Sequence, residues 1–266
     1  MDSFVCDTCG TVWPPSPAPP AACPICLDER QYLPPGGQRW TTLSALRASR
    51  RQGFRYEHRM LALAPEPPFA IGQRALLVRS PGGNVLWDCV TLVDRASAEI
   101  LSALGGIDAI AISHPHYYSA MADWSAAFDA PVYTHADDAG FVVNKASEHR
   151  FWEGERLEIL PGLTLIRCGG HFEGASVLHS AHEPGGALFT GDVLQVAPDG
   201  EHLGFMRSYP NYLPLGAAAV RRIEAALDGL EFEAIYGAFW NRVIAKGGRE
   251  ALARSVERHV DWVTRA

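Results

Sequence analysis

A short apolar run that leads directly into two histidines constrains this chain more than any other feature. Residues 107–113 read IDAIAIS, which is typical of a buried strand, and His114-Pro115-His116 follow at once. In an extended segment residues i and i+2 point to the same side, so both imidazoles are able to bind one ion. Sites in α/β proteins usually lie at the carboxyl ends of buried strands. The pattern therefore predicts a metal site at the end of this strand.

Apolar runs and helical patterns alternate around that strand. The runs 74–79 and 84–88 are separated by SPGG, which predicts a hairpin. A helical pattern over 96–104 stops at Gly105-Gly106. Further helices are expected at about 119–128, directly after 131–135, at 214–228 and at 248–265. Further strands are expected at 131–135, 163–167, 176–181, 186–190 and 233–237. This mixture indicates an α/β layered fold.

Four of the six cysteines form two CxxC pairs near the N-terminus, Cys6 with Cys9 and Cys23 with Cys26. Each pair is able to chelate an ion from a tight turn, and two pairs complete a tetrahedral thiolate shell. The segment TVWPPSPAPPAA between them has no periodicity, so we expect the metal to hold the module together. The paired spacing favours metal binding over disulfides.

The CxxCG and CPxC pattern resembles zinc ribbons and also the short rubredoxin-like domain of rubrerythrins, which binds iron. Zinc is favoured because no second redox site is evident, but spacing alone leaves iron open. The Pro-Pro and Gly-Gly pairs of YLPPGGQRW indicate a linker, which divides the chain into a ribbon at 1–38 and a second domain at 39–266. Thr41 or Thr42 is expected to cap a short helix that ends near Arg51.

Four motifs in the second domain resemble those of metallo-β-lactamase-fold hydrolases, in the order that the family has them. SHPHYY resembles the family's HxHxDH motif, SPGGNVLWDC its early hairpin, the segment that ends in His171 its third histidine, and GALFTGDVL its TGD segment with Asp192. The resemblance covers about residues 56–245. It implies an α/β four-layer αββα sandwich and a metal held by His114, His116, His171 and Asp192.

The sequence departs from the family at the second metal. Tyr118 and Ser119 stand where HxHxDH has its aspartate and last histidine, and Ala238, Phe239 and Trp240 stand where a late histidine is expected. Three ligands are lost together, so a single ion is predicted in this domain. Zinc suits three histidines and a carboxylate, although iron or manganese accepts the same ligands.

The resemblance implies hydrolysis of an ester, thioester, lactone or lactam by a single metal-bound water, with zinc in both sites. Asp192 is expected to orient the water, and Tyr118 to donate a hydrogen bond to the developing oxyanion. The loop 205–212 is expected to bring Arg207 and Asn211 to the substrate. The alternative is a non-catalytic metal- or ligand-binding protein, or a scaffold whose ribbon recruits a partner. A redox role ranks last, because neither a diiron ligand set nor a flavin domain is evident.

Charge and hydropathy limit the classes of partner that we expect this chain to bind. A formal net charge of -7 argues against a broad nucleic-acid surface. The start MDSFVCDTCG lacks the features of a secretory signal, and no apolar run reaches the roughly 18 residues of a membrane span. We therefore expect a cytoplasmic protein that acts on a small molecule without membrane contact. A homodimer is compatible with the sequence.

Overall fold

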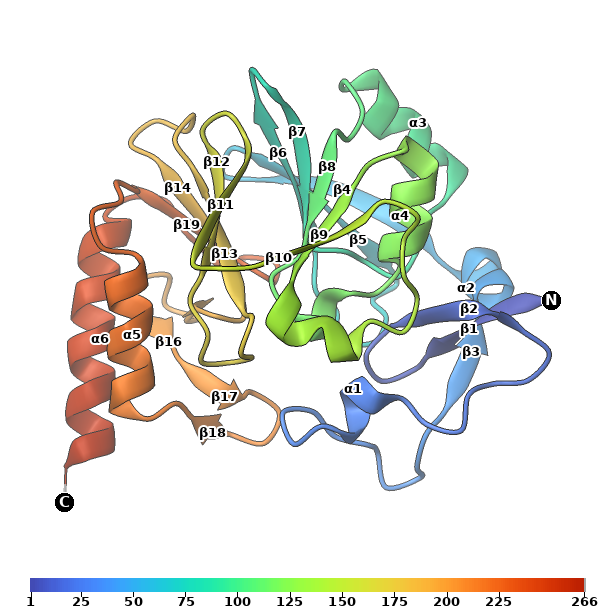
Figure 1. Cartoon of the computed structure of the whole chain (residues 1–266), viewed down its shortest axis with the longest axis horizontal. Coiled ribbons are helices and arrows are strands. Elements are labelled where there is room, and N and C mark those ends of the chain that lie inside the picture. The colour runs from blue at the N-terminus through green and yellow to red at the C-terminus, as the bar shows by residue number, and fades with distance from the viewer. Residues whose placement is uncertain (266) are drawn as a thin grey trace.

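A computed structural model describes residues 1–265, in which two β-sheets face each other (Figure 1). The first sheet has seven strands, in the order β10 (His149–Trp152), β9 (Val132–His135), β8 (Ala109–Ala111), β7 (Gly83–Trp87), β6 (Ala75–Ser80), β5 (Met60–Glu66) and β4 (Arg51–Glu57). The second has six strands, in the order β11 (Arg156–Leu160), β12 (Leu163–Arg167), β13 (Ser176–Ser180), β14 (Ala187–Gly191), β19 (Ala234–Gly237) and β20 (Val243–Ile244).

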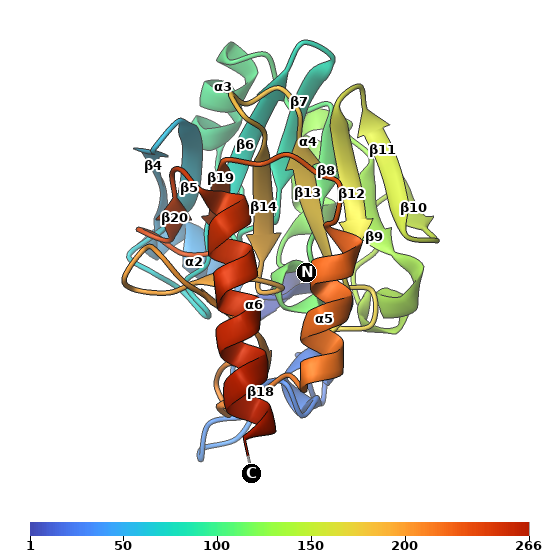
Figure 2. The same cartoon turned by 90° about the vertical axis from the view of Figure 1, so that its left-hand side faces the viewer.

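Helices cover the outer face of each sheet. Helices α3 (Arg95–Ala103) and α4 (Met121–Phe128) lie on the first sheet, while α5 (Ala217–Ala226) and α6 (Gly248–Thr264) run side by side over the second (Figure 2). The resulting order is helix, sheet, sheet, helix. The predicted four-layer αββα fold is confirmed.

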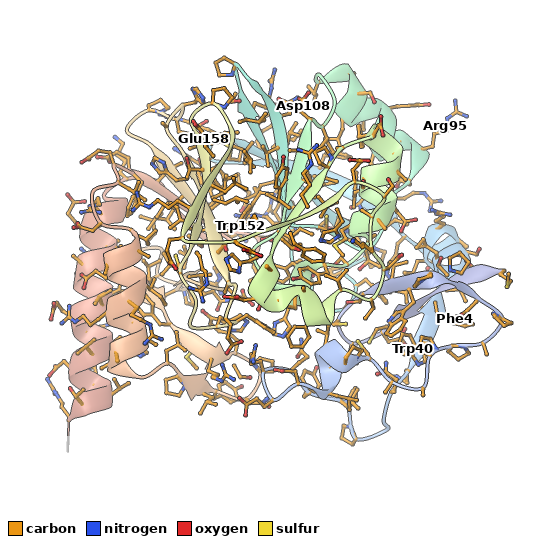
Figure 3. The ribbon with its side chains drawn as sticks, in the orientation of Figure 1. Phe4, Trp40, Arg95, Asp108, Trp152 and Glu158 are labelled. Carbon is orange, nitrogen blue, oxygen red and sulfur yellow. The ribbon has the colours of Figure 1, made fainter. Side chains whose placement is uncertain are left out.

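Large apolar side chains fill the space between the sheets (Figure 3). Trp87 of β7 and Trp152 of β10 meet Leu165 of β12 and Phe189 of β14 in one buried cluster. Two further clusters pack the outer faces of the sheets against their helices. Burial on both faces explains why the central strands appear in the sequence as unbroken apolar runs.

The cap expected at Thr41 or Thr42 is confirmed at Thr42, and a cap at Asp94 that was not predicted begins α3 one residue before the expected start. The Asp94 carboxylate accepts a 2.7 Å hydrogen bond from the Ser97 amide at the start of α3. Thr42 accepts from the Ala45 amide at 3.2 Å and so begins α2 (Leu43–Ser49). Such caps satisfy amides that have no partner inside the helix. Sequence therefore located these helix starts to within a residue or two.

Some elements were not anticipated. The hairpin of β4 and β5 was missed, and β4 carries no apolar run because most of its residues are at least partly exposed at the edge of the sheet. Edge strand β10 was also missed, and so was β11. The helix expected after β9 is a short 3-10 helix, η2 (Ala136–Phe141).

The N-terminal module is a three-stranded antiparallel sheet with the order β2 (Val12–Ser16), β1 (Asp2–Cys6) and β3 (Trp40–Thr42). The short helix α1 (Pro24–Leu27) lies between β2 and β3 in the chain. Val5 and Val12 share a buried cluster with Leu63 and Leu77 of the first sheet, so the ribbon packs directly on the larger domain. The domain boundary after residue 38 falls just before β3 and stays a prediction.

Two short hairpins follow the second sheet's strand β14. One pairs β15 (Gln195–Val196) with β16 (Leu203–Gly204), and the other pairs β17 (Met206–Ser208) with β18 (Leu213–Pro214). The second hairpin reaches toward the chain just after α1 (Figure 1). No helix within residues 1–265 is long and apolar enough to cross a membrane.

Candidate metal centres

The four ribbon cysteines converge on one point. Their sulfurs are buried, and all lie within 4.8 Å of one another. The Cys6 and Cys26 sulfurs are 3.6 Å apart, as are those of Cys9 and Cys23. A disulfide requires about 2.05 Å, whereas a tetrahedral ion with metal–sulfur bonds of about 2.3 Å places its sulfurs roughly 3.8 Å apart. The cluster therefore fits a metal and not disulfides.

Polar donors around this cluster favour thiolates. The Gln38 amide donates to the Cys6 sulfur at 3.2 Å, and the Thr11 hydroxyl lies 3.2 Å from the Cys9 sulfur. Hydrogen bonds to the charged form of a thiol favour that form, which is the form that binds metal. The ribbon thus provides both the ligands and part of their charge compensation.

The second centre brings together the four residues that the sequence predicted. His114, His116, His171 and Asp192 each offer a ligand atom within 4.8 Å of the others, and all four are buried. His114 follows β8 and begins the 3-10 helix η1 (Pro115–Tyr117), His171 lies in the loop after β12, and Asp192 follows β14. These positions cluster at the same end of both sheets.

The ligand spacing fits a small divalent ion. The His116 Nδ1 atom lies 3.4 Å from His171 Nε2, and tetrahedral metal–nitrogen bonds of about 2.0–2.1 Å imply a separation of roughly 3.4 Å. The His114 Nε2 atom is buried, has no hydrogen-bond partner among the described residues, and lies 3.7 Å from Asp192 Oδ2. A bound ion would satisfy this atom. The residues present therefore fit a metal.

Neighbouring groups orient two of the imidazoles. His171 Nδ1 lies 3.0 Å from the Met206 carbonyl, so that nitrogen donates and Nε2 is left to bind metal. The Ser113 hydroxyl donates to Asp88 Oδ1 at 2.8 Å and lies 2.8 Å from His114 Nδ1, which leaves His114 Nε2 to face the centre. Such contacts to the far nitrogen of a ligand histidine fix its tautomer and ring direction. Sequence reasoning missed Asp88, although the early hairpin's aspartate was the available signal.

Burial sets the charge state of this cluster. It lowers the pKa of His171 to about 4 and those of His114 and His116 well below the ordinary value. Neutral imidazole is the form that ligates. Burial also raises the pKa of Asp192 to about 7, while the Tyr117 hydroxyl, which donates to Asp192 Oδ1 at 2.8 Å, opposes that rise.

The structure separates the two tyrosines of the SHPHYY motif. Tyr117 contacts Asp192, as described above. Tyr118 is buried, and its hydroxyl donates to the Asp138 carbonyl at 3.4 Å instead of joining the metal ligands. The catalytic role assigned to Tyr118 stays a prediction.

Gly191 in the TGD segment is required by a close approach. Its φ is +51°, and a Cβ atom built there would lie 2.3 Å from the Ser113 hydroxyl. That contact is far inside van der Waals range, and the left-handed backbone disfavours other residues. The glycine thus lets β14 pass close to the Ser113 contact that orients His114.

Packing occupies the positions where a second metal would be bound. Ser119 accepts a hydrogen bond from the Gln73 amide at 3.0 Å. Buried Arg74 donates to the Gly237 carbonyl at 2.9 Å and pairs with Glu57, and the Glu57 carboxylate in turn accepts from the Asn241 backbone N–H. Within residues 1–265, two clusters of histidine, cysteine or acidic side chains could hold an ion: the ribbon cysteines and the histidine–aspartate cluster.

A cavity of about 240 Å³ adjoins the histidine cluster. His116 and Asp192 line it, together with Gln195 and Tyr209. The ribbon supplies further wall residues, which sequence reasoning did not place at the site: Thr8, Gln31 and Tyr32. The cavity is therefore shared between the ribbon and the larger domain.

Arg207 and Asn211, expected at the substrate, contact the ribbon instead. The Arg207 guanidinium donates to the Glu29 carboxylate at 2.6 Å, and the Asn211 amide donates to the Glu29 and Gln31 carbonyls at 3.0 Å each. Both residues belong to the hairpin of β17 and β18 or its turn. This hairpin joins the two parts of the chain.

Fold and site together define a metal-binding αββα sandwich protein, and comparison with known proteins agrees. The Metallo-beta-lactamase superfamily model matches residues 70–236. The uncharacterized protein YmaE of Bacillus subtilis (strain 168) is 44% identical over 265 residues, which cover 98% of this chain and 96% of that protein. The chain belongs to the metallo-β-lactamase superfamily, whose hydrolase fold it has.

Solved structures support the fold. TMB-1 aligns with a TM-score of 0.57 at 11% identity, covering 80% of this chain and 99% of that one. The DIM-1 metallo-beta-lactamase aligns with a TM-score of 0.55 at 12% identity, covering 81% and 98%. At such identities the likeness concerns the fold alone.

Proposed function

We propose that this protein is a hydrolase that uses a single metal ion to cleave a small ester, thioester, lactone or lactam. The observation that carries the proposal is the preformed set of three neutral imidazoles and one carboxylate beside a cavity. Three histidines with an additional oxygen ligand are typical of zinc sites that keep a position for water. Zinc is proposed in both centres, with iron as the alternative at either.

When bound, a zinc ion supplies a water that ionises near neutral pH. The side chains of this site position the reaction around it. Tyr117 holds Asp192 Oδ1, which leaves Oδ2 to bind the ion or to accept a proton from the attacking water. Burial holds the pKa of Tyr117 well above its ordinary value, so its hydroxyl keeps the proton that it donates.

The oxyanion role predicted for Tyr118 requires its hydroxyl to leave the Asp138 carbonyl. Tyr118→Phe tests that role directly, and Tyr117→Phe is the matched comparison because it removes the hydroxyl held by Asp192. If Tyr118 stabilises an oxyanion, its phenylalanine variant loses about 10²-fold or more in kcat. Unchanged kcat in Tyr118→Phe rejects the role.

The hydrolase proposal is tested with 4-nitrophenyl acetate, phenyl thioacetate, γ-butyrolactone and nitrocefin, each assayed with the wild type and with His116→Ala. Elemental analysis accompanies the assays, with about two zinc ions per wild-type chain and one per variant chain expected. At least one substrate should be cleaved by the wild type and lose about 10³-fold or more in rate in the variant, because the ion is removed. Equal rates in the two proteins contradict hydrolysis at this site.

The non-catalytic alternative is favoured by one observation, the packing of Ser119 and of the segment 237–241 where a second metal would be held. It predicts that both metals bind while none of these substrates is cleaved faster than by His116→Ala. The same assay therefore separates the two functions.

A further inference from the structure

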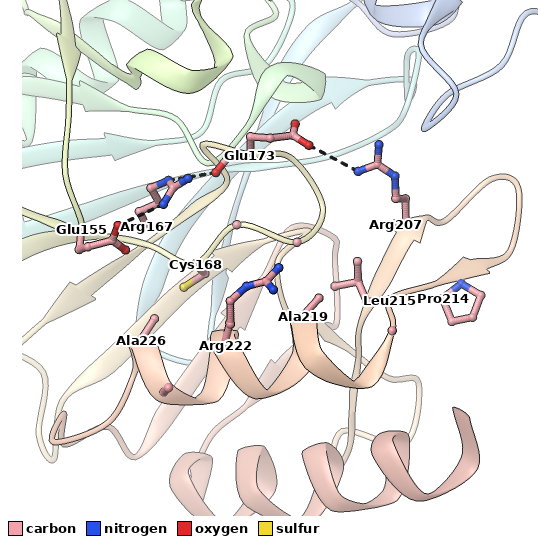
Figure 4. Close-up of a pocket in the computed structure, with 14 residues that line it drawn as sticks. Glu155, Arg167, Cys168, Glu173, Arg207, Pro214, Leu215, Ala219, Arg222 and Ala226 are labelled. Atoms are coloured by element: carbon pink, nitrogen blue, oxygen red, sulfur yellow. Dashed lines mark hydrogen bonds and ion pairs between the residues drawn. The ribbon is translucent and has the colours of Figure 1, made fainter. Parts of the chain in front are cut away.

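The ribbon is fixed against the larger domain at the residues that reach the cavity. Besides the Arg207 and Asn211 contacts, the Ser208 hydroxyl donates to the Arg30 carbonyl at 3.0 Å. Arg207 also forms an ion pair at 3.8 Å with Glu173 (Figure 4). Glu173 lies two residues after His171 in the chain. The hairpin thus holds ribbon residues 29–31 through their backbone carbonyls and through the Glu29 side chain.

The same hairpin contacts the metal centre. Its Met206 carbonyl is the group that orients His171. From the ribbon side, the buried Arg30 guanidinium lies 4.0 Å over the ring of Phe172, the residue after His171. The ribbon segment is therefore positioned relative to the metal ligands by direct contacts and not by a flexible tether.

Gln31 is the ribbon residue best placed to meet a ligand. It is 6% exposed, and it lines the cavity with His116 and Asp192. Its backbone carbonyl is bonded to Asn211, while its side-chain amide makes no hydrogen bond to any residue within 1–265. The Gln31 amide is not among the fully buried side-chain polar atoms that lack a partner, so it is open to solvent and available to bond a ligand group in place of water.

The other walls of the cavity carry no net charge beyond the metal cluster. Ile71, Pro210 and Phe239 are apolar, while Thr8, Tyr32 and Gln195 are polar and neutral. Among the described residues that line it there is no lysine or arginine to pair with an anionic ligand. Its volume of about 240 Å³ lies below the roughly 300–1,000 Å³ of drug-sized sites.

We infer that Gln31 of the ribbon is a substrate-positioning residue, and that the substrate is a small, uncharged carbonyl compound. The inference rests on the proposed hydrolysis for its reaction, but not for the binding that it describes. The Gln31 side-chain amide is able to donate to an oxygen of the substrate or to accept from an N–H of the substrate, while the reacting carbonyl group faces the metal. The ribbon thus contributes to recognition as well as to stability.

Binding is measured without turnover in protein whose metals are replaced by Co²⁺. Acetohydroxamic acid, a small carbonyl ligand that is uncharged in solution and releases a proton to the buffer when it binds metal, is titrated while the visible bands of the histidine-bound cobalt are followed. Gln31→Ala should raise the Kd about three- to tenfold, and Gln31→Leu, which keeps the side-chain volume, should do the same because the amide is what is lost. Succinic acid monohydroxamate, which adds a negative charge, should bind the wild type at least about tenfold more weakly.

Ser16→Ala is the control, since it removes a ribbon hydroxyl that bonds only the Ala18 carbonyl within the described chain. The thiolate-to-cobalt bands of the ribbon report whether each variant is folded. Equal Kd values in Gln31→Leu and the wild type, with the ribbon bands intact, overturn the role of Gln31. Equal or tighter binding of the charged hydroxamate overturns the uncharged substrate class.

Hydrolysis provides the second readout. On any substrate that His116→Ala fails to cleave, Gln31→Leu should raise KM about three- to tenfold with a smaller change in kcat. An unchanged KM on such a substrate rejects the Gln31 inference and leaves the hydrolase proposal intact. Absence of cleavage by the wild type rejects the hydrolase proposal, while the cobalt titration still decides the role of Gln31.

Discussion

At the scale of single residues, groups outside the candidate ligands orient the histidine–aspartate cluster. Ser113 connects buried Asp88 to His114, with both hydrogen bonds at 2.8 Å. The Ser113 amide also donates to Asp88 at 2.8 Å. Burial raises the pKa of Asp88 to about 7, against the effect of these bonds. The three residues together determine which nitrogen of His114 faces the metal.

Replacing Ser113 by alanine should weaken the metal centre without emptying the ribbon. The variant loses the hydroxyl that holds His114 Nδ1, so zinc affinity at the histidine cluster is expected to fall about 10–100-fold. Competition with a chromophoric chelator measures this affinity, and the ribbon zinc serves as an internal reference.

Ser125→Ala is the matched control, because this serine of α4 is also buried. Among the described residues its hydroxyl bonds only the Ala130 carbonyl. Its zinc affinity should equal that of the wild type. The same chelator midpoint in Ser113→Ala and Ser125→Ala would disprove the orienting role of Ser113.

At the scale of elements, η2 contacts the loop that carries the third histidine. Asp138 of η2 accepts a 3.0 Å hydrogen bond from the Gly174 amide, three residues after His171. Asp138 is 2% exposed, and burial raises the pKa of its carboxyl to about 7 from the ordinary 3.8. Between these values the folded protein binds a proton that the unfolded chain releases. The contribution of Asp138 to stability is therefore present at low pH and falls as pH rises toward 7.

Asp138→Asn should remove this pH dependence, because asparagine keeps the acceptor oxygen and cannot ionise. Relative to the variant, the wild type is expected to lose about 1–3 kcal/mol of unfolding free energy between pH 5 and pH 8. Urea unfolding of the metal-loaded proteins at both pH values measures the difference.

Asp129→Asn provides the comparison, since Asp129 is an exposed residue in the left-handed region that asparagine also adopts. Its unfolding free energy should track that of the wild type at both pH values. If Asp138→Asn also tracks the wild type, the buried carboxyl does not titrate in this window.

At the scale of the whole molecule, the ribbon and the sandwich form one packed unit. Val5 and Val12 are buried with residues of the first sheet, and the β17–β18 hairpin holds ribbon residues 29–31. The ribbon's own hydrophobic content is small, so the metal that we propose for its four cysteines would stabilise a part of the molecule that also encloses the cavity.

Removal of the ribbon metal should therefore be felt beyond the ribbon. In Cys23→Ser with Cys26→Ser, elemental analysis should find about one metal fewer per chain. The free energy of unfolding should fall by about 2 kcal/mol or more, which lowers the Tm by roughly 5 °C for a chain of this size. Faster amide hydrogen exchange is expected in residues 1–40 and in the β17–β18 hairpin.

Cys168→Ala is the control for loss of a buried cysteine, because Cys168 lies outside the ribbon and should leave the metal count unchanged. Wild-type exchange rates in the β17–β18 hairpin of the double variant would show that the ribbon does not support that hairpin.

The sequence by itself determined the layers of the fold and the candidate metal ligands. Buried strands and capped helices are encoded locally, by apolar runs and by residues such as Asp94 and Thr42. The four cysteines and the set His114, His116, His171 and Asp192 are encoded by spacing and motif order. The tertiary structure decided the rest, since Tyr117, Gln31 and Arg207 owe their contacts to segments far away in the chain. Local pattern predicts which residues bind a metal, but only packing decides which side chains surround them.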